Sequence, residues 1–201
     1  MTVGARLGLG LAFVALAAPL LHGEDASLRL LFPADRSVLE AGRFEVIGVL
    51  PEGATEAPPL RVDGKSAEWL PVAAPVLVAR LELSSGAHEI ALGSTTLRIY
   101  VRGEEPPDDW AAFQSHPGAQ DGWKNCAVCH ETAEVDGRTT VGDLREPEAC
   151  RECHSADDFQ LAHFHPERPL AGCHQCHALH GSPNESFLKS PIKQLCAKCH
   201  D

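Results

Sequence analysis

Four short motifs in the C-terminal half of the chain combine two cysteines and one histidine at a fixed spacing. They read CAVCH at 126–130, CRECH at 150–154, CHQCH at 173–177 and CAKCH at 196–200. Their first cysteines are 24, 23 and 23 residues apart, and the motifs hold all eight cysteines of the chain. On a short helix, positions i, i+3 and i+4 lie on one face. Each motif therefore predicts two thiols and one imidazole on the same side of a helical turn.

These side chains suit covalent attachment of haem. Two thiols on one face can form thioether bonds with the two vinyl groups of one porphyrin, and the adjacent histidine then reaches the iron. We therefore expect four covalently attached haem c groups. The predicted attachment residues are Cys126, Cys129, Cys150, Cys153, Cys173, Cys176, Cys196 and Cys199. The predicted proximal iron ligands are His130, His154, His177 and His200.

Two other uses of paired cysteines compete with haem. The spacing between motifs also fits a zinc ribbon, in which two CxxC pairs hold one metal ion. Eight cysteines in an exported chain could instead form four disulfides. Neither alternative explains why a histidine follows every CxxC pair, so the haem interpretation is favoured.

The second axial ligand of each iron follows by elimination. Cytochromes commonly use methionine or histidine there, and the sole methionine of the chain is Met1. Histidine is therefore expected on both sides of every iron. His174 lies between two attachment cysteines and would have to bend back to reach iron, so we interpret it as a bystander. The predicted distal ligands are the four remaining histidines of this region, His116, His163, His165 and His180.

An internal repeat relates the two halves of this region. CAVCH and CRECH recur as CHQCH and CAKCH with an offset of about 47 residues. His116 lies ten residues before its motif, and either His163 or His165 is its equivalent in the second half.

The repeat is incomplete at His180. The first half has Ala133 at that position, which leaves the distal donor for one first-half haem open. The HFH sequence at 163–165 could supply one imidazole to each half. His180 lies three residues after His177 and therefore on the same side of that porphyrin, so we expect it to ligate a neighbouring haem.

The same residues resemble the doubled-CxxCH and class III multihaem cytochromes c over about residues 110–201. The most specific part is HFHPERPLAGCHQCHALHGSPNESFLKSPIKQLCAKCHD, at 163–201. The resemblance implies a haem-dominated domain of short helices and loops with closely packed haems. It also implies electron transport in the periplasm or at the cell surface.

The N-terminus predicts export. Residues 1–23 hold one early positive charge, Arg6, and a 15-residue apolar run at 7–21, which suits a signal peptide better than a membrane span. Cleavage would leave no integral membrane span; an uncleaved anchor is the alternative. The expected location is periplasmic or extracellular, outside the reducing cytosol.

Residues 24–103 contain no cysteine and predict a small all-β sandwich. Short apolar runs alternate with turn signals, as in FEVIGVL before PEGAT and VLVARLEL before SSG. We expect antiparallel pairing, and PADRSVLEAGRFEVIGVL resembles the opening strands of immunoglobulin-like or fibronectin-like modules. Residues 104–109, with two prolines and four acids, predict a linker. The tetrahaem domain would then occupy 110–201.

Charge and ligation together indicate the class of function. The chain carries a net charge of −11, and residues 104–201 contain 17 acidic against 8 basic side chains. This balance argues against nucleic acid as a partner and favours redox partner proteins with a basic docking face. An iron with two histidine ligands has no open position for substrate, so we expect an electron carrier and not an enzyme.

Two alternatives stay open at this stage. The chain could be an electron-transfer subunit of a membrane-associated reductase complex or of a haem filament, with a histidine crossing between protomers. It could also be a small multihaem reductase, if one distal histidine does not bind and one iron stays open.

Overall fold

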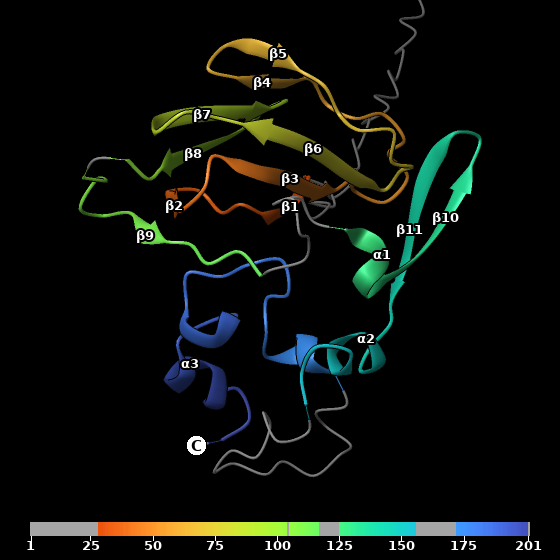
Figure 1. Ribbon diagram of the computed structural model, residues 1–201, viewed down its shortest axis with the longest axis vertical. Helices are drawn as coiled ribbons and strands as arrows, with labels where there is room; N and C mark the ends of the chain where they lie inside the picture. Colours follow the sequence, from red (N-terminus) through yellow and green to blue (C-terminus); the bar gives the residue numbers. More distant parts are fainter. Residues whose placement is uncertain (1–27, 104, 117–124, 156–171, 201) are drawn as a thin grey trace, which may run out of the picture.

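The larger part of the molecule is a sandwich of two β-sheets (Figure 1). The computed structural model describes residues 28–103, 105–116, 125–155 and 172–200. One sheet has the strand order β1-β3-β6, and the other has the order β5-β4-β7-β8-β2-β9. The strands are β1 (Arg29–Phe32), β2 (Ser37–Leu39), β3 (Arg43–Val49), β4 (Leu60–Val62), β5 (Lys65–Ala67), β6 (Val76–Glu82), β7 (Gly86–Leu92), β8 (Thr95–Val101) and β9 (Ala111–Ala112).

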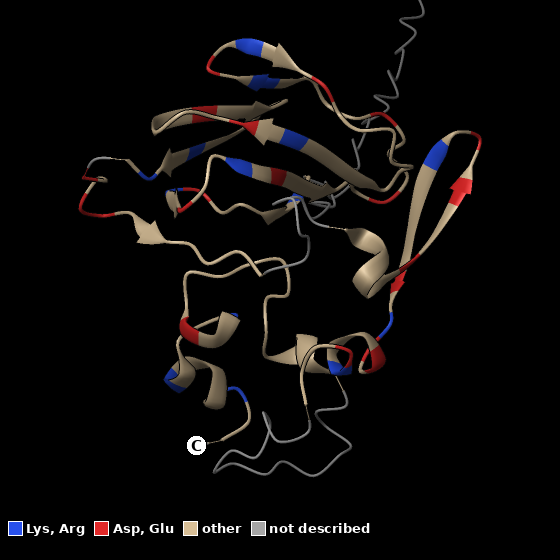
Figure 2. Ribbon diagram, viewed as in Figure 1, with Lys and Arg blue, Asp and Glu red and all other residues tan. Residues whose placement is uncertain are grey.

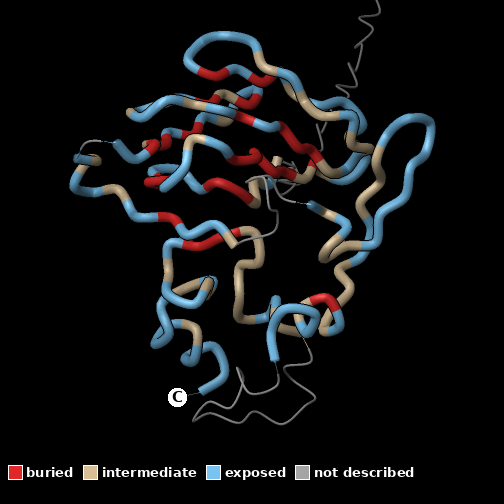
Figure 3. Tube along the Cα trace, in the orientation of Figure 1, coloured by how far each residue is buried: buried red, intermediate tan, exposed pale blue. Residues whose placement is uncertain are grey.

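Alternating side chains of the two sheets form the hydrophobic core. In β8, Leu97, Ile99 and Val101 are buried, whereas Thr96 and Arg98 on the other face are exposed. This alternation confirms the face predicted from the sequence. Figure 3 shows that the buried residues concentrate in the sandwich. The prediction of an all-β sandwich in this part of the chain is therefore confirmed.

Strand β2 departs from the expected antiparallel pairing. It runs parallel to β8, with Ser37 opposite Ile99, and parallel to β9, with Ser37 opposite Ala111. The prediction missed β2 because it has three residues, all buried, and so shows no alternation. It missed β9 because two alanines carry no strand pattern.

The described part of the C-terminal region contains short helices and one hairpin that was not expected. The helices are α1 (Cys126–Cys129), α2 (Glu148–Arg151), η2 (Cys173–Gln175), η3 (Glu185–Phe187) and α3 (Ile192–Cys196). The hairpin pairs β10 (His130–Val135) with β11 (Arg138–Leu144). Its turn is Asp136-Gly137, both with positive φ, which is a strong hairpin signal. The prediction overlooked it because β10 is mostly exposed and has no apolar alternation.

The C-terminal region has little core of its own. Among the described residues after Gln114, Ala149 is the one buried hydrophobic side chain. In Figure 3 this part of the chain is coloured mostly as exposed or intermediate. Within the described ranges, no helix is long and apolar enough to cross a membrane. The predicted signal peptide at 1–23 lies outside those ranges.

Candidate haem-binding site

Each of the four motifs forms a single helical turn. The backbone N–H of its histidine donates to the carbonyl of its first cysteine in every case. In the first motif, His130 is the C-cap residue of α1 and donates to Cys126. The equivalent distances are 2.9 Å at 150–154, 2.9 Å at 173–177 and 3.0 Å at 196–200. This i to i+4 bond gives each CxxCH sequence the local geometry that its spacing predicts.

Two of the predicted proximal histidines have a defined tautomer. The Nδ1 of His130 lies 3.0 Å from the carbonyl oxygen of Gly142 in β11. The Nδ1 of His177 lies 2.7 Å from the carbonyl oxygen of Ser186. A carbonyl can only accept, so Nδ1 carries a hydrogen, and in a neutral ring the lone pair is then on Nε2. A metal-binding histidine usually has such a hydrogen bond on the ring nitrogen that does not bind the metal, and this bond orients the ring.

Two predicted distal histidines lie close to predicted proximal ones. The ring centres of His130 and His180 are 6.2 Å apart, and the ring planes differ by 9°. The ring centres of His116 and His154 are also 6.2 Å apart, with planes at 50°. The structure thus brings together residues from segments far apart in sequence and places His180 against the histidine of the first motif.

These separations can be compared with the space that an iron needs. An imidazole nitrogen binds a metal at about 2 Å, and the ring centre lies roughly 1 Å beyond that nitrogen. Two imidazoles on opposite sides of one iron therefore have centres about 6 Å apart. Both histidine pairs meet this requirement. The residues present fit haem iron, and the scarcity of buried apolar side chains around them fits a region that packs on porphyrin.

The remaining predicted ligands are placed in part. His163 and His165 lie outside the described residues. His200 is exposed at the end of the fourth motif.

His174, interpreted as a bystander, points to Glu146. Its backbone N–H donates to one carboxylate oxygen of Glu146 at 2.8 Å, and its Nδ1 is hydrogen-bonded to the other oxygen. Burial raises the pKa of Glu146, but the hydrogen bonds from His174 outweigh it and hold the pKa below its ordinary value.

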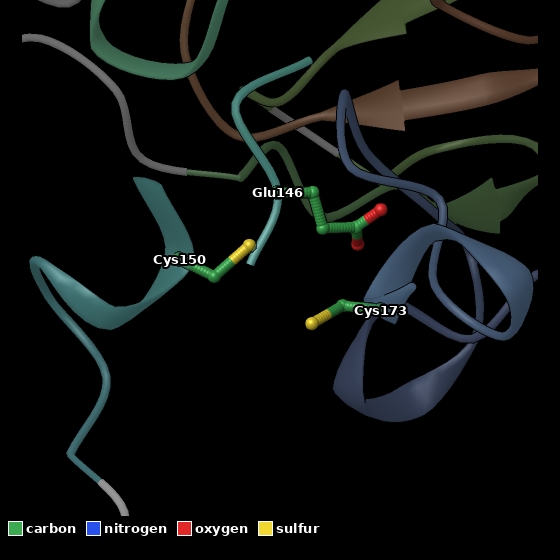
Figure 4. A group of neighbouring side chains, drawn as sticks. All are labelled: Glu146, Cys150 and Cys173. Atoms are coloured by element: carbon green, nitrogen blue, oxygen red, sulfur yellow. The ribbon is translucent and has the colours of Figure 1, made fainter. Parts of the chain in front are cut away.

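The second and third motifs meet at their first cysteines. Figure 4 shows the side chains of Cys150 and Cys173 converging with that of Glu146. One ligand atom from each lies within 4.8 Å of the others. Burial, together with the neighbouring Cys150, raises the pKa of Cys173 to about 11. The Cys173 thiol is therefore uncharged near neutral pH.

Sequence reasoning missed the groups that hold the histidines. The carbonyls of Gly142 and Ser186 are backbone atoms and leave no signature in residue types. Glu146 is one acid among many in an acidic chain. Gly181 directly follows His180, and a glycine beside a predicted ligand was the one signal available.

Comparisons with known proteins agree with this geometry. The family described as "Doubled CXXCH motif" matches residues 167–201, which contain the third and fourth motifs. The multiheme cytochrome MtrA of Shewanella baltica is 35% identical over 79 residues. That match covers 37% of this chain and 23% of the relative.

The chain is thus similar to multihaem c-type cytochromes with doubled CxxCH motifs. It spans less than a quarter of the length of the relative that it matches. No solved structure matches it significantly. The family match ends short of the β sandwich, so the architecture of that part is known from the structure alone.

Proposed function

We propose that this chain is an exported electron carrier in which all four CxxCH motifs hold haem c with two histidine ligands per iron. The observation that carries the proposal is the pair of imidazole separations of 6.2 Å, His130 to His180 and His116 to His154. Each pair joins a motif histidine to a histidine that the sequence singled out as a distal ligand.

The pairing also assigns the remaining ligands. His116 precedes the first motif by ten residues but lies against His154 of the second motif. By the internal repeat, His163 would then serve His200, the second motif of its own half. His165 would remain for the haem of His177. The two first-half haems would be served by His116 and His180, and the HFH sequence would give both imidazoles to the second half.

Bound haem supplies an iron that gains and loses one electron. The histidines of the chain would hold the iron from both sides, which would leave no position for a substrate and would favour electron transfer over catalysis. Two nitrogen ligands without a thioether sulfur favour the oxidised iron, so low potentials are expected. The Nδ1–H bonds to Gly142 and Ser186 hold the proximal rings in place and increase their basicity.

The chain also sets which haems are neighbours. Cys150 and Cys173 would each anchor an edge of its own porphyrin, and their sulfur atoms lie in one cluster. The haems of the second and third motifs would therefore share an edge. His180 extends from the loop after the third motif to the histidine of the first. Both links favour passage of electrons between the two halves of the repeat.

An acidic hairpin offers a docking surface for a redox partner. In β10, which begins at the proximal ligand His130, Glu131 and Glu134 are exposed, and Asp136 is exposed in the turn. Figure 2 shows that acidic positions outnumber basic ones along the hairpin, and Arg138 is the first residue of β11. A partner with a basic face would be steered to this surface. Periplasmic or extracellular location follows from the predicted signal at 1–23.

The β sandwich at 24–103 is proposed to be an immunoglobulin-like module. Strands β1, β3 and β6 face a sheet that contains β4, β7 and β8 as neighbours. This division corresponds to the A, B and E strands against the C, F and G strands of immunoglobulin sandwiches.

A redox and ligand-binding titration of the purified holoprotein tests the proposal. We expect four reversible one-electron reductions, a low-spin spectrum in both oxidation states and no binding of cyanide to the oxidised protein. A high-spin ferric haem that binds cyanide or nitrite in the wild type would instead support a reductase. Six-coordination that appears only in a dimer would support a ligand shared between protomers.

A further inference from the structure

The segments that carry the two distal histidines are joined by an isolated antiparallel β-bridge between Gln114 and Ser182. The N–H of Gln114 donates to the carbonyl of Ser182, and the N–H of Ser182 donates to the carbonyl of Gln114, both at 2.9 Å. His116 lies two residues after Gln114, and His180 lies two residues before Ser182. Both imidazoles are therefore positioned from one point in the molecule.

That point is anchored in the core of the β sandwich. The Phe113 N–H donates to the carbonyl of Val38 in β2 at 2.8 Å. Its ring is buried and packs edge-to-face on Phe32, with ring centres 5.4 Å apart. Gly181 is packed against both rings: a Cβ there would lie 2.5 Å from Cε1 of Phe113, 3.0 Å from Cε2 of Phe32 and 2.8 Å from the Gln114 carbonyl oxygen. The φ of Gly181, 150°, also suits glycine.

Hydrogen bonds of the buried Ser182 fix the loop at 182–188, which follows Gly181. Ser182 is 1% exposed; its hydroxyl donates to the carbonyl of Leu188 at 2.6 Å and accepts from the N–H of Asn184 at 2.9 Å. The Asn184 amide donates to the same Leu188 carbonyl at 3.0 Å. Phe187, in the same loop, packs edge-to-face on His116 at 5.2 Å between ring centres. The loop therefore contacts one distal ring and carries the other.

We propose that the β sandwich positions the distal ligands of the first two haems through a clamp of Phe113, Gln114, Gly181 and Ser182. The inference rests on the bis-histidine proposal and assigns the sandwich a part in it. An iron–imidazole bond requires placement within about 0.5 Å, which a loop without support does not provide. The clamp supplies that support from a packed core.

The hairpin ties the opposite ligand of the first haem to the same sandwich. The Thr139 N–H of β11 donates to the Pro71 carbonyl, and the Ala73 N–H donates to the Thr139 carbonyl, both at 2.9 Å. The hairpin in turn holds the His130 ring through the carbonyl of Gly142. The sandwich therefore supports both His130 and His180. It supports His130 through the hairpin and His180 through the Gln114–Ser182 contact.

The variant Gly181→Ala tests the clamp in the intact holoprotein. The added Cβ must displace Phe113 or the Gln114 carbonyl, and His180 and His116 move with them. We expect at least one of the four haems, and at most two, to become high-spin when oxidised. The number of cyanide ions bound per protein should equal the number of high-spin haems. The number of haems counted by mass should stay unchanged. Gly53→Ala is the control, because Gly53 also has a positive φ, 82°, but nothing lies within 4 Å of its added Cβ.

A second pair of variants keeps the test decisive if Gly181→Ala does not fold. Phe113→Leu and Phe44→Leu shorten two rings that are 5% and 4% exposed and that both pack on Phe32. Phe113→Leu should convert haem to the high-spin state at a temperature where both variants are folded, and Phe44→Leu should not. Equal spectra for the two variants, with a wild type that is fully six-coordinate, would overturn the clamp. A wild type that already binds cyanide would instead refute the bis-histidine proposal itself.

Discussion

Replacement of His180 by alanine should open one axial position on one iron. The ring of His180 lies 6.2 Å from that of His130 with its plane tilted by 9°, and His180 is the proposed second ligand of the first-motif haem. The variant removes one of eight axial imidazoles. About one quarter of the haem should become high-spin, because one iron in four loses a ligand.

Optical and electron paramagnetic resonance spectra of the oxidised protein measure this fraction. Cyanide should bind at one equivalent per protein, and added imidazole should restore the low-spin spectrum by filling the space that the side chain leaves. His180→Met should instead keep six ligands and raise the potential of one haem, within the range of about 0.8 V that axial ligands span.

His174→Ala provides the matched control. This histidine lies in the same stretch of chain but hydrogen-bonds to Glu146. Its loss should leave all haems low-spin. The assignment of His180 as a ligand would be wrong if His180→Ala stayed entirely low-spin and bound no cyanide, or if His174→Ala produced the high-spin signal instead.

Three further predictions concern haem attachment, acid stability and docking. Serine at both cysteines of the 126–130 motif should remove the mass of one haem and leave three; an unchanged mass would count against attachment there. Asp35→Asn should lower the free energy of unfolding at pH 7 by at most about 1 kcal/mol, because the hydrogen bond from the Arg98 side chain holds the pKa of Asp35 below its ordinary value. That stability is present above about pH 4 and is lost as the pH falls through the lowered pKa. In urea titrations, the difference in unfolding free energy between wild type and variant should therefore shrink toward pH 3. A difference that grew toward pH 3 would argue against the ion pair. Glu131→Gln with Glu134→Gln should slow reduction by a basic redox protein at low salt and have little effect at high salt; equal slowing at both ionic strengths would exclude steering by these acids.

The four motifs were readable from the sequence because covalent attachment fixes residue type and spacing within five positions. The local turn of each motif follows from the same spacing. Two of the distal candidates, His116 and His180, lie close to motif histidines in the structure, while His163 and His165 stay predictions. These residues could be named by elimination because the chain offers so few other donors.

The pairing of ligands could not be read from the sequence because it depends on long-range packing. His116 lies closer in sequence to the first motif but faces the histidine of the second. The contacts responsible are the β-bridge between Gln114 and Ser182 and the packing of Gly181 on two phenylalanines. Backbone carbonyls and close approaches to glycine are invisible to residue patterns. The same limitation hid β9, whose two alanines form a strand only because the edge of β2 is available.

Bis-histidine ligation of four haems is tested most directly by an anomalous difference map at the iron absorption edge from crystals of the holoprotein. Four iron peaks are expected, one at each CxxCH motif. One peak should lie between the Nε2 atoms of His130 and His180 and another between the imidazoles of His116 and His154. Fewer than four peaks, or an iron of the first two motifs with any other residue on its distal side, would contradict this ligation.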